Sequence, residues 1–343
     1  MFDFINSVNL FPEQQLVLLY RLHKEALPKE KLIKARELYQ KANALDLKQF
    51  AMFQQISVLL RANNIPFCPI KGADLSWRVY PDGALRSMCD IDILIQKCDC
   101  QKVKELLISN KWRTPYEIPN ESHLPPMQKN GVTLELHFAV SEFDAPAENL
   151  WQYMITENGV SRLPLEINLL LLFNHAKKHN WAEGGKLLLD AAFLIAKEGY
   201  PDIEKMREYA KAMNCSSAEL LFAAYPEIFP DATGVKTFAP QVIAVFRKLF
   251  AKPMGEHTKI KERVLLAKNR FTLAWWKERL YGMSVASIRF QTNNPKGNYL
   301  KLLWGYCSVF AAKLSFFWHF KKERCDRSVA VRIDDIDFIN RNL

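Results

Sequence analysis

The chain has 343 residues, of which 49% are hydrophobic, enough for one large or two smaller folded domains with a substantial core. Its formal net charge of +10 suits an anionic ligand, a nucleic acid or a membrane surface without distinguishing among them. This composition argues against a disordered chain. No transmembrane segment is expected, because the longest apolar run, 302–312, is shorter than a membrane span.

The cysteines indicate a reducing compartment. The seven cysteines are odd in number and scattered, and the chain begins Met1-Phe2-Asp3-Phe4, without the features of a signal peptide. Reduced thiols and a cytoplasmic location are therefore expected. Cys98-Asp99-Cys100 lacks the second ligand pair of a zinc site, so we interpret the cysteines as structural.

Apolar residues recur at helical spacing in the first part of the chain. The spacing predicts helices over 12–26, 29–45 and 50–62. We interpret residues 1–64 as an N-terminal helical cap that packs against a sheet.

Residues 65–145 have the pattern of a compact core with strands. The expected elements are a strand at 66–70, a helix at 73–79, a loop at 80–89, a strand at 90–95, a helix at 99–110, a proline-rich irregular loop at 115–130 and a strand within 131–140.

Residues 146–343 are expected to form a mainly helical region. The predicted helices are 163–179, 186–196, 202–213, 218–224, 240–251, 256–290 and 298–322, and the tail 329–333 is predicted to be a last strand or an extended arm. The fold class that follows is α+β, with a small mixed sheet embedded in a predominantly helical chain.

Two carboxylates open the strand at 90–95. Side chains alternate along a strand, so Asp90 and Asp92 lie on the same face, ahead of the apolar run Ile93-Leu94-Ile95. Burying unpaired charge is unfavourable, so a cation or basic side chains must compensate. A divalent metal is the sharper interpretation, because Mg²⁺ prefers one or two carboxylates together with substrate phosphates.

A basic turn precedes these carboxylates. Gly72 would let backbone N–H groups approach a phosphate at the start of the next helix. Lys71 and Arg86 supply positive charge on either side of that helix. Together with the paired carboxylates, this turn suggests a site for a nucleoside triphosphate and a metal.

The strand within 131–140 supplies a third carboxylate. Its alternation puts Thr133, Glu135 and His137 on one face. Asp335-Ile336-Asp337 repeats the Asp-x-Asp pattern but has no upstream Lys-Gly turn and no downstream acidic strand, so we interpret it as surface charge.

In order and spacing, these motifs resemble the uncharacterised nucleotidyltransferase family of the polymerase-β-like nucleotidyltransferase superfamily. The resemblance covers roughly 50–195 and rests on Lys71-Gly72, Tyr80-Pro81, Arg86, Asp90-Ile91-Asp92-Ile93-Leu94-Ile95, Glu135-Leu136-His137 and the segment with His175, His179, Trp181 and Asp190. The superfamily usually has Gly-Ser or Gly-Gly at the phosphate turn, where this chain has Gly72-Ala73. The gap from Gly72 to Asp90 is also longer than the corresponding gap in minimal members of the superfamily.

The resemblance implies in-line attack of an acceptor on the α-phosphate of a nucleoside triphosphate such as ATP, with pyrophosphate leaving. Asp90, Asp92 and Glu135 would hold two Mg²⁺ ions, with Mn²⁺ as an alternative, and Glu135 could act as general base. The implied nucleotide- and phosphate-binding residues are Lys71, Gly72, Arg86 and His137.

Simpler structural roles remain open for the same residues. Asp90 and Asp92 could form a salt-bridged turn with Arg86, Glu135 could pair with a basic residue on a neighbouring strand, and His137 could be a hydrogen-bonded structural histidine.

His175 and His179 lie four positions apart and could share a metal with Asp190. We favour a structural role, in which these three polar side chains hold the helical region against the core.

The acceptor is not specified by the sequence: a small molecule such as an aminoglycoside-like sugar, a protein side chain and a nucleic-acid end are all open. No obligate protein partner is evident.

The alternative function is a catalytically degenerate nucleotide- or RNA-binding protein, motivated by Gly72-Ala73 and the basic C-terminal third. A toxin–antitoxin partner is a third hypothesis. The aromatic and basic residues of 271–324 are interpreted as core first, a nucleic-acid surface second and a membrane surface third.

Overall fold

The computed structural model describes residues 10–114, 122–145, 150–157, 159–182, 184–250 and 327–343, together with 304 and 307. The helices are α2 (Pro12–His23), α3 (Lys29–Ala62), α4 (Gly72–Asp74), α5 (Cys100–Ser109), α7 (Leu165–Lys178), α8 (Gly184–Glu198), α9 (Ile203–Ala212), α10 (Glu219–Ala224), α11 (Pro240–Phe250) and α16 (Arg327–Asn342). The strands are β1 (Phe67–Pro69), β2 (Asp90–Ile95), β3 (Met127–Lys129), β4 (Val132–His137), β5 (Ile155–Glu157) and β6 (Val160–Arg162).

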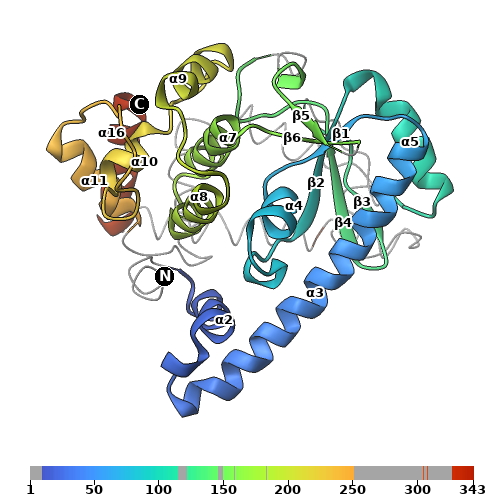
Figure 1. Cartoon of the computed structure of the whole chain (residues 1–343), viewed down its shortest axis with the longest axis horizontal. Helices are drawn as coiled ribbons and strands as arrows, with labels where there is room; N and C mark the ends of the chain where they lie inside the picture. Colours follow the sequence, from blue (N-terminus) through green and yellow to red (C-terminus); the bar gives the residue numbers. More distant parts are fainter. Residues whose placement is uncertain are drawn as a thin grey trace.

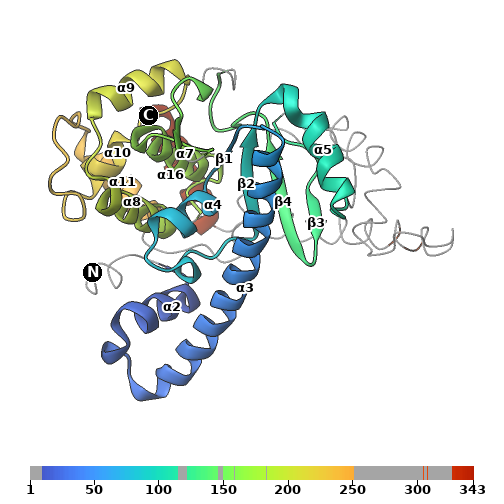
Figure 2. The same cartoon turned by 45° about the vertical axis from the view of Figure 1, so that its right-hand side comes forward.

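The protein has the expected α+β fold, with a small mixed sheet beside a bundle of helices (Figure 1). The four-stranded sheet has the order β1-β2-β4-β3. Its central pair, β2 and β4, is parallel, whereas β1 and β3 are antiparallel to their neighbours. The long helix α3 runs across one face of the sheet, and α4 lies between the sheet and helices α7 and α8 (Figure 2).

Alternation along the central strands divides the sheet between two cores. Ile91 and Ile93 of β2 and Leu134 and Leu136 of β4 are fully or almost fully buried, in one cluster with apolar residues of α3 and α5. Leu94 points to the opposite face, where it joins the large cluster formed by α7, α8 and the other C-terminal helices. The polar side chains of β2 and β4 share that second face. They therefore lie between the sheet and helices α7–α11 and α16, which we call the helical half.

A buried ion pair joins the loop before β2 to the helical half. Arg86 Nε and Nη2 donate to the two carboxylate oxygens of Asp190, on α8, at 2.7 and 2.9 Å. Tyr80 Oη donates to the same carboxylate at 2.6 Å. Removal of one partner from such a pair leaves the other charge buried and uncompensated.

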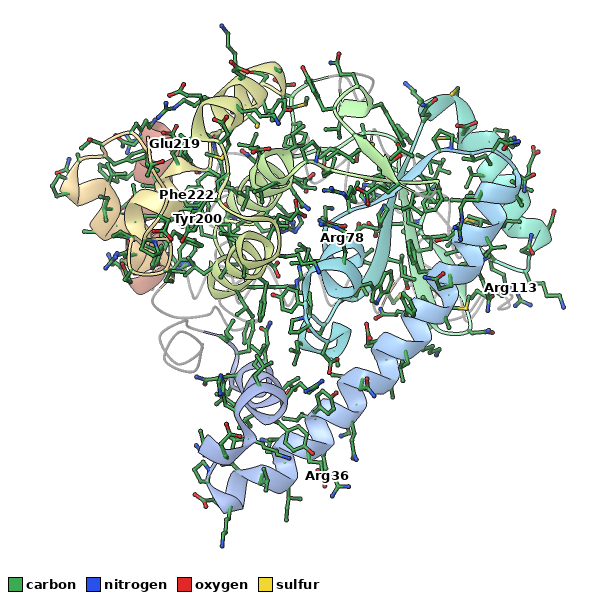
Figure 3. The ribbon with its side chains drawn as sticks, in the orientation of Figure 1. Arg36, Arg78, Arg113, Tyr200, Glu219 and Phe222 are labelled. Atoms are coloured by element: carbon green, nitrogen blue, oxygen red, sulfur yellow. The ribbon has the colours of Figure 1, made fainter. Side chains whose placement is uncertain are left out.

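A second network ties the segment after the basic turn to the same helices. Arg78 donates to both oxygens of Asp74, and Asn168 of α7 donates to Asp74 Oδ2 at 2.8 Å. Arg78 also contacts Glu198, the last residue of α8. Figure 3 shows Arg78 between the sheet-bearing half and the helical half.

Several expected elements differ in the structure. The helices predicted at 29–45 and 50–62 form the single helix α3, because no glycine or proline separates them. The helix predicted at 73–79 is the short α4 followed by a π-helical turn, Leu75–Val79. Residues 127–129, predicted as loop, pair with β4 as strand β3.

The C-terminal predictions also need correction. Residues 155–162, predicted as helical, form the β5–β6 hairpin, whose Gly159 has a φ of +73°. The tail predicted as strand or arm belongs to helix α16, where the fully buried Ile336 and Ile339 recur at helical spacing. The helices predicted at 256–290 and 298–322 lie outside the described residues. The domain boundaries expected at 64 and 145 stay predictions.

No helix within the described ranges is long and apolar enough to cross a membrane.

We predict that Asp190→Ala lowers the free energy of unfolding by about 3–5 kcal/mol, because Arg86 and Tyr80 lose their buried partner. Urea unfolding followed by circular dichroism measures the change. The control is Asp231→Ala, an exposed carboxylate whose loss should alter stability by less than about 0.5 kcal/mol. A loss below about 1 kcal/mol for Asp190→Ala would contradict the structural role of the pair.

Candidate active site

The parallel pairing of β2 and β4 builds a cluster of ionisable side chains. Asp92 lies opposite Glu135, and Leu94 lies opposite His137. His137 Nε2 lies 2.7 Å from Asp92 Oδ1 and 3.6 Å from Glu135 Oε2. Asp92, Glu135 and His137 each offer one ligand atom, and these atoms all lie within 4.8 Å of one another. Among the residues that the structure describes, these three form the group that could hold a metal ion.

Asp92 is the buried member of this cluster and is held ionised. Burial opposes the charged form, but the hydrogen bond with His137 and the charge of Lys71 outweigh it and lower the pKa of Asp92. A buried carboxylate kept charged in this way is suited to bind a cation.

Asp90 has the opposite electrostatic character. It pairs with Thr133 at the start of the same two strands and shares the face of Asp92, but it lies outside the group of three. Burial, and then the charges of Asp92 and Glu135, raise the pKa of Asp90 to about 6. Ionisation of Asp90 is therefore less favourable than that of an exposed aspartate.

Lys71 occupies a strained turn beside the carboxylates. Its backbone has φ +52° and ψ −123°, a conformation that residues other than glycine rarely adopt. The turn directs Lys71 Nζ between Asp92 Oδ1, at 3.6 Å, and Glu142 Oε1, at 3.7 Å. Burial disfavours the ammonium, but the surrounding carboxylates, led by Asp92 and Glu142, raise the pKa of Lys71 above its usual value.

Gly72 follows this turn at the start of α4. A Cβ atom at Gly72 would lie 3.0 Å from Met88 Cβ, so close packing alone favours a glycine there. Arg86 lies nearby, but its guanidinium faces Asp190 and also donates to the Ser87 carbonyl at 3.0 Å. The turn therefore brings Lys71, rather than Arg86, to the carboxylates.

Glu142 belongs to the site but was missed by the sequence analysis. Its side chain is 2% exposed, forms an ion pair with Lys71 at 3.7 Å and is hydrogen-bonded to His175 Nδ1 at 2.7 Å. Burial is outweighed by the hydrogen bond with His175 and by Lys71, which hold the pKa of Glu142 well below its usual range. Because Glu142 follows the strand, the alternation that revealed Glu135 does not extend to it. The sequence feature that could have revealed Glu142 is a carboxylate just past the end of β4, together with a histidine on α7 that could pair with it.

The predicted helical histidines lie beside this site without forming a metal group. The rings of His175 and His179 are 4.5 Å apart, and His175 is bonded to Glu142. Asp190, the third suggested ligand, is instead bonded to Arg86 and Tyr80. Within the described residues, His175, His179 and Asp190 are not part of a metal-ligating group.

The donor set fits a divalent cation. Carboxylate oxygens suit Mg²⁺ and Mn²⁺, whereas imidazole suits transition metals better. Asp92 and Glu135 would thus be the principal ligands for Mg²⁺, and His137 would either complete the set or orient Asp92 by its hydrogen bond.

Comparison with known proteins agrees with this geometry. The family model described as "Uncharacterised nucleotidyltransferase" matches residues 16–230, more than half of the chain. The chain belongs to this family. The resemblance expected from the motifs is therefore confirmed, and the match spans the sheet, α3, α7 and α8 of this nucleotidyltransferase.

The solved structures include one match, the antibiotic-resistance factor ANT(2'')-Ia, described as having substrate-regulated conformation dynamics. It is 13% identical, with a TM-score of 0.37, over 49% of this chain and 92% of that protein. No curated protein matches the chain.

We predict that Asp90→Asn stabilises the metal-free protein at pH 7.5, by about 1–2 kcal/mol after allowance for solvent screening. The folded-state pKa of Asp90, about 6, is above that of an unfolded aspartate, about 3.9, so stability falls as the pH rises between these two values and stays at the lower level above pH 6. The gain should be full at pH 7.5 and vanish near pH 4.

Thermal unfolding in a chelator between pH 4 and 8 measures this gain. Asp337→Asn, an exposed aspartate of the other Asp-x-Asp, is the control and should show no such trend. Asp90→Asn being less stable than wild type at pH 7.5 would refute the prediction.

Proposed function

We propose that this nucleotidyltransferase moves a nucleoside monophosphate from a nucleoside triphosphate to an acceptor, with release of pyrophosphate. The observation that carries the proposal is the register of β2 and β4, which puts Asp92, Glu135 and His137 in one cluster. The basic turn at Lys71 and Gly72 supports it, because it lies beside these carboxylates and opens a helix.

We assign the cation-binding role to Asp92 and Glu135, with Asp90 as a further carboxylate on the same face. A divalent cation bound there, Mg²⁺ or Mn²⁺, would offset phosphate charge and lower the pKa of the attacking hydroxyl. It would also offset the repulsion that raises the pKa of Asp90, so that Asp90 could be ionised in the loaded protein.

The half-buried Glu135 is the candidate to accept the proton of the acceptor. His137 orients Asp92 through the 2.7 Å hydrogen bond at Nε2, and Nδ1 is the nitrogen proposed to contact a phosphate. These two roles are compatible because the imidazole has two nitrogens.

Lys71 is the proposed phosphate contact. Its distances of 3.6 and 3.7 Å to Asp92 and Glu142 are ion-pair rather than hydrogen-bond distances, so its ammonium can still donate to a phosphate oxygen. The N–H groups at Gly72 would contribute as the first donors of α4. Arg86, paired with Asp190, would act through the position of this turn.

The test is pyrophosphate release from each of the four NTPs with Mg²⁺ and a pooled acceptor extract. We expect Asp92→Asn to lower the rate about 100-fold or more, because the buried cation ligand is lost. Asp337→Asn is the matched control, since it changes an exposed aspartate in the second Asp-x-Asp and should leave the rate unchanged.

Equal rates for Asp92→Asn and wild type would reject the assigned site. If the wild type binds nucleotide in a thermal-shift assay but releases no pyrophosphate with any acceptor pool, the alternative is favoured: a catalytically degenerate nucleotide- or RNA-binding protein.

A further inference from the structure

A cavity of about 500 Å³ opens beside the carboxylate cluster and has no role in the mechanism above. Four parts of the chain line it: residues 141–144 after β4, the last turns of α7, residues 214–216 after α9, and Leu343 after α16. Glu142 is part of its wall, and Glu142 is also the residue that contacts Lys71. Glu142 and Lys71, which form an ion pair, connect the wall of the cavity to Asp92.

One end of the cavity holds a cation without an anionic partner. Lys177 Nζ donates to Ser216 Oγ at 2.6 Å, and within the described part of the chain no carboxylate lies at ion-pair distance from it. Burial disfavours the charged form and lowers the pKa of Lys177. An anion bound here would relieve that cost.

The donors around Lys177 are rigidly held. Asn174 fixes the backbone of Ser216 on both sides, donating to its carbonyl at 2.8 Å and accepting from its N–H at 3.1 Å. Since the Ser216 hydroxyl accepts from Lys177, its own hydrogen can be donated into the cavity. Ammonium and hydroxyl together form a small preorganised site for anionic oxygen.

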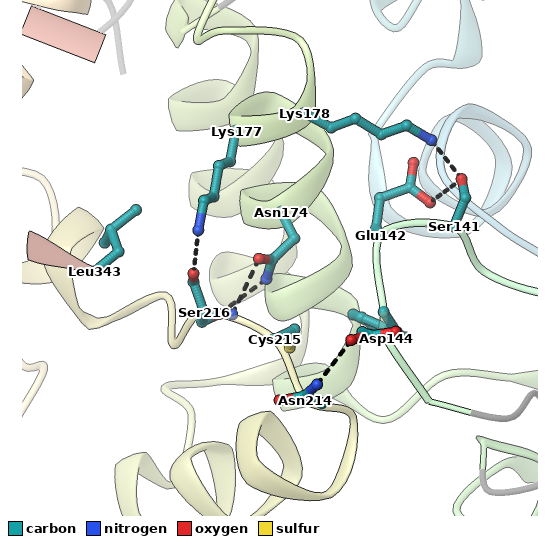
Figure 4. A pocket seen from close by; sticks show the side chains of 11 residues that line it. Ser141, Glu142, Asp144, Asn174, Lys177, Lys178, Asn214, Cys215, Ser216 and Leu343 are labelled. Atoms are coloured by element: carbon teal, nitrogen blue, oxygen red, sulfur yellow. Dashed lines mark hydrogen bonds between the residues drawn. The ribbon is translucent and has the colours of Figure 1, made fainter. Parts of the chain in front are cut away.

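The other end of the cavity approaches the proposed reaction centre. Figure 4 shows Lys177 and Ser216 on one side, and Ser141, Glu142 and Lys178 on the other. Lys178 donates to Ser141 at that second end. A molecule anchored at Lys177 would thus extend toward Glu142, the carboxylate that pairs with Lys71.

We propose that this cavity is the acceptor site, and that the acceptor is a small molecule with an anionic group, phosphate or carboxylate, bound by Lys177 and Ser216. The acceptor role rests on the proposed nucleotidyl transfer.

The position of the lysines has a simpler partial explanation. Cations are favoured in the last turn of a helix by the helix dipole, and Lys177 and Lys178 lie in the last turn of α7. This explains why lysines occur there. It does not explain why Lys177 is half-buried in a cavity, bonded to a hydroxyl that Asn174 holds in place.

The test uses isothermal titration of the full-length protein with glycerol 3-phosphate, and with glycerol as the neutral probe. We expect wild type to bind glycerol 3-phosphate and not glycerol, and Lys177→Met to bind it at least tenfold more weakly. Lys211→Met, which removes an exposed lysine of α9, is the control and should bind as wild type does. Lys177→Met should fold, because it removes a half-buried charge; circular dichroism verifies this.

The same variants are then titrated with Mg-ATP. Unchanged ATP affinity in Lys177→Met, with weakened glycerol 3-phosphate binding, supports an acceptor site. Tenfold weaker ATP binding would assign the cation to the nucleotide's own phosphates and overturn the acceptor role. Absence of glycerol 3-phosphate binding to wild type, or equal binding by Lys177→Met, would overturn the anion site itself.

Failure of the two proposals is distinguishable. Asp92→Asn should retain glycerol 3-phosphate binding, because Asp92 does not line the cavity. Absence of pyrophosphate release with glycerol 3-phosphate binding retained would therefore count against the proposed reaction. Pyrophosphate release without glycerol 3-phosphate binding would count against the proposed role of the cavity alone.

Discussion

The repulsion among carboxylates on one face of a small sheet is the constraint on which the rest of this structure depends. Asp90, Asp92, Glu135 and Glu142 all act electrostatically on the single ammonium of Lys71. That ammonium can stay among them only in a backbone conformation that is unfavourable by about 1–3 kcal/mol for a non-glycine residue. Such strain persists where surrounding contacts enforce it, and here it coincides with the proposed reaction centre.

Those surrounding contacts come largely from the helical half. Helix α7 supplies His175 to Glu142 and Asn168 to Asp74. Helix α8 supplies Asp190 to Arg86 and a contact to Arg78. Side chains of α7 and α8 thus hold the residues that surround the basic turn. The helices are therefore part of the support of the site, because the sheet alone would leave several buried charges unpaired.

The local part of this site was predictable from sequence because it depends on the two-residue period of strands. That period alone put Asp90 with Asp92, and Glu135 with His137, on common faces. The register that joins the two strands was not readable, because pairing between distant segments leaves no local pattern. The partners of Arg86 and Lys71 were missed for the same reason: Asp190 and Glu142 are determined by tertiary packing. Helix α16 shows the converse error, since its β-branched residues suggested a strand while packing at Ile336 and Ile339 selected a helix.

The long-range ion pairs have a consequence for the order in which the chain is made. Arg86 and Asp190 are 104 positions apart, and Arg78 and Glu198 are 120 apart. At about 5–20 residues per second of translation, the basic turn and β2 leave the ribosome roughly 5–20 s before α8 does. Once β4 has also emerged, the nascent sheet can form its α3-facing core, but Arg86 still lacks Asp190, and Arg78 has its neighbour Asp74 but not Glu198. The contacts that support the proposed active site are therefore completed late in synthesis, when α8 supplies Asp190 and Glu198.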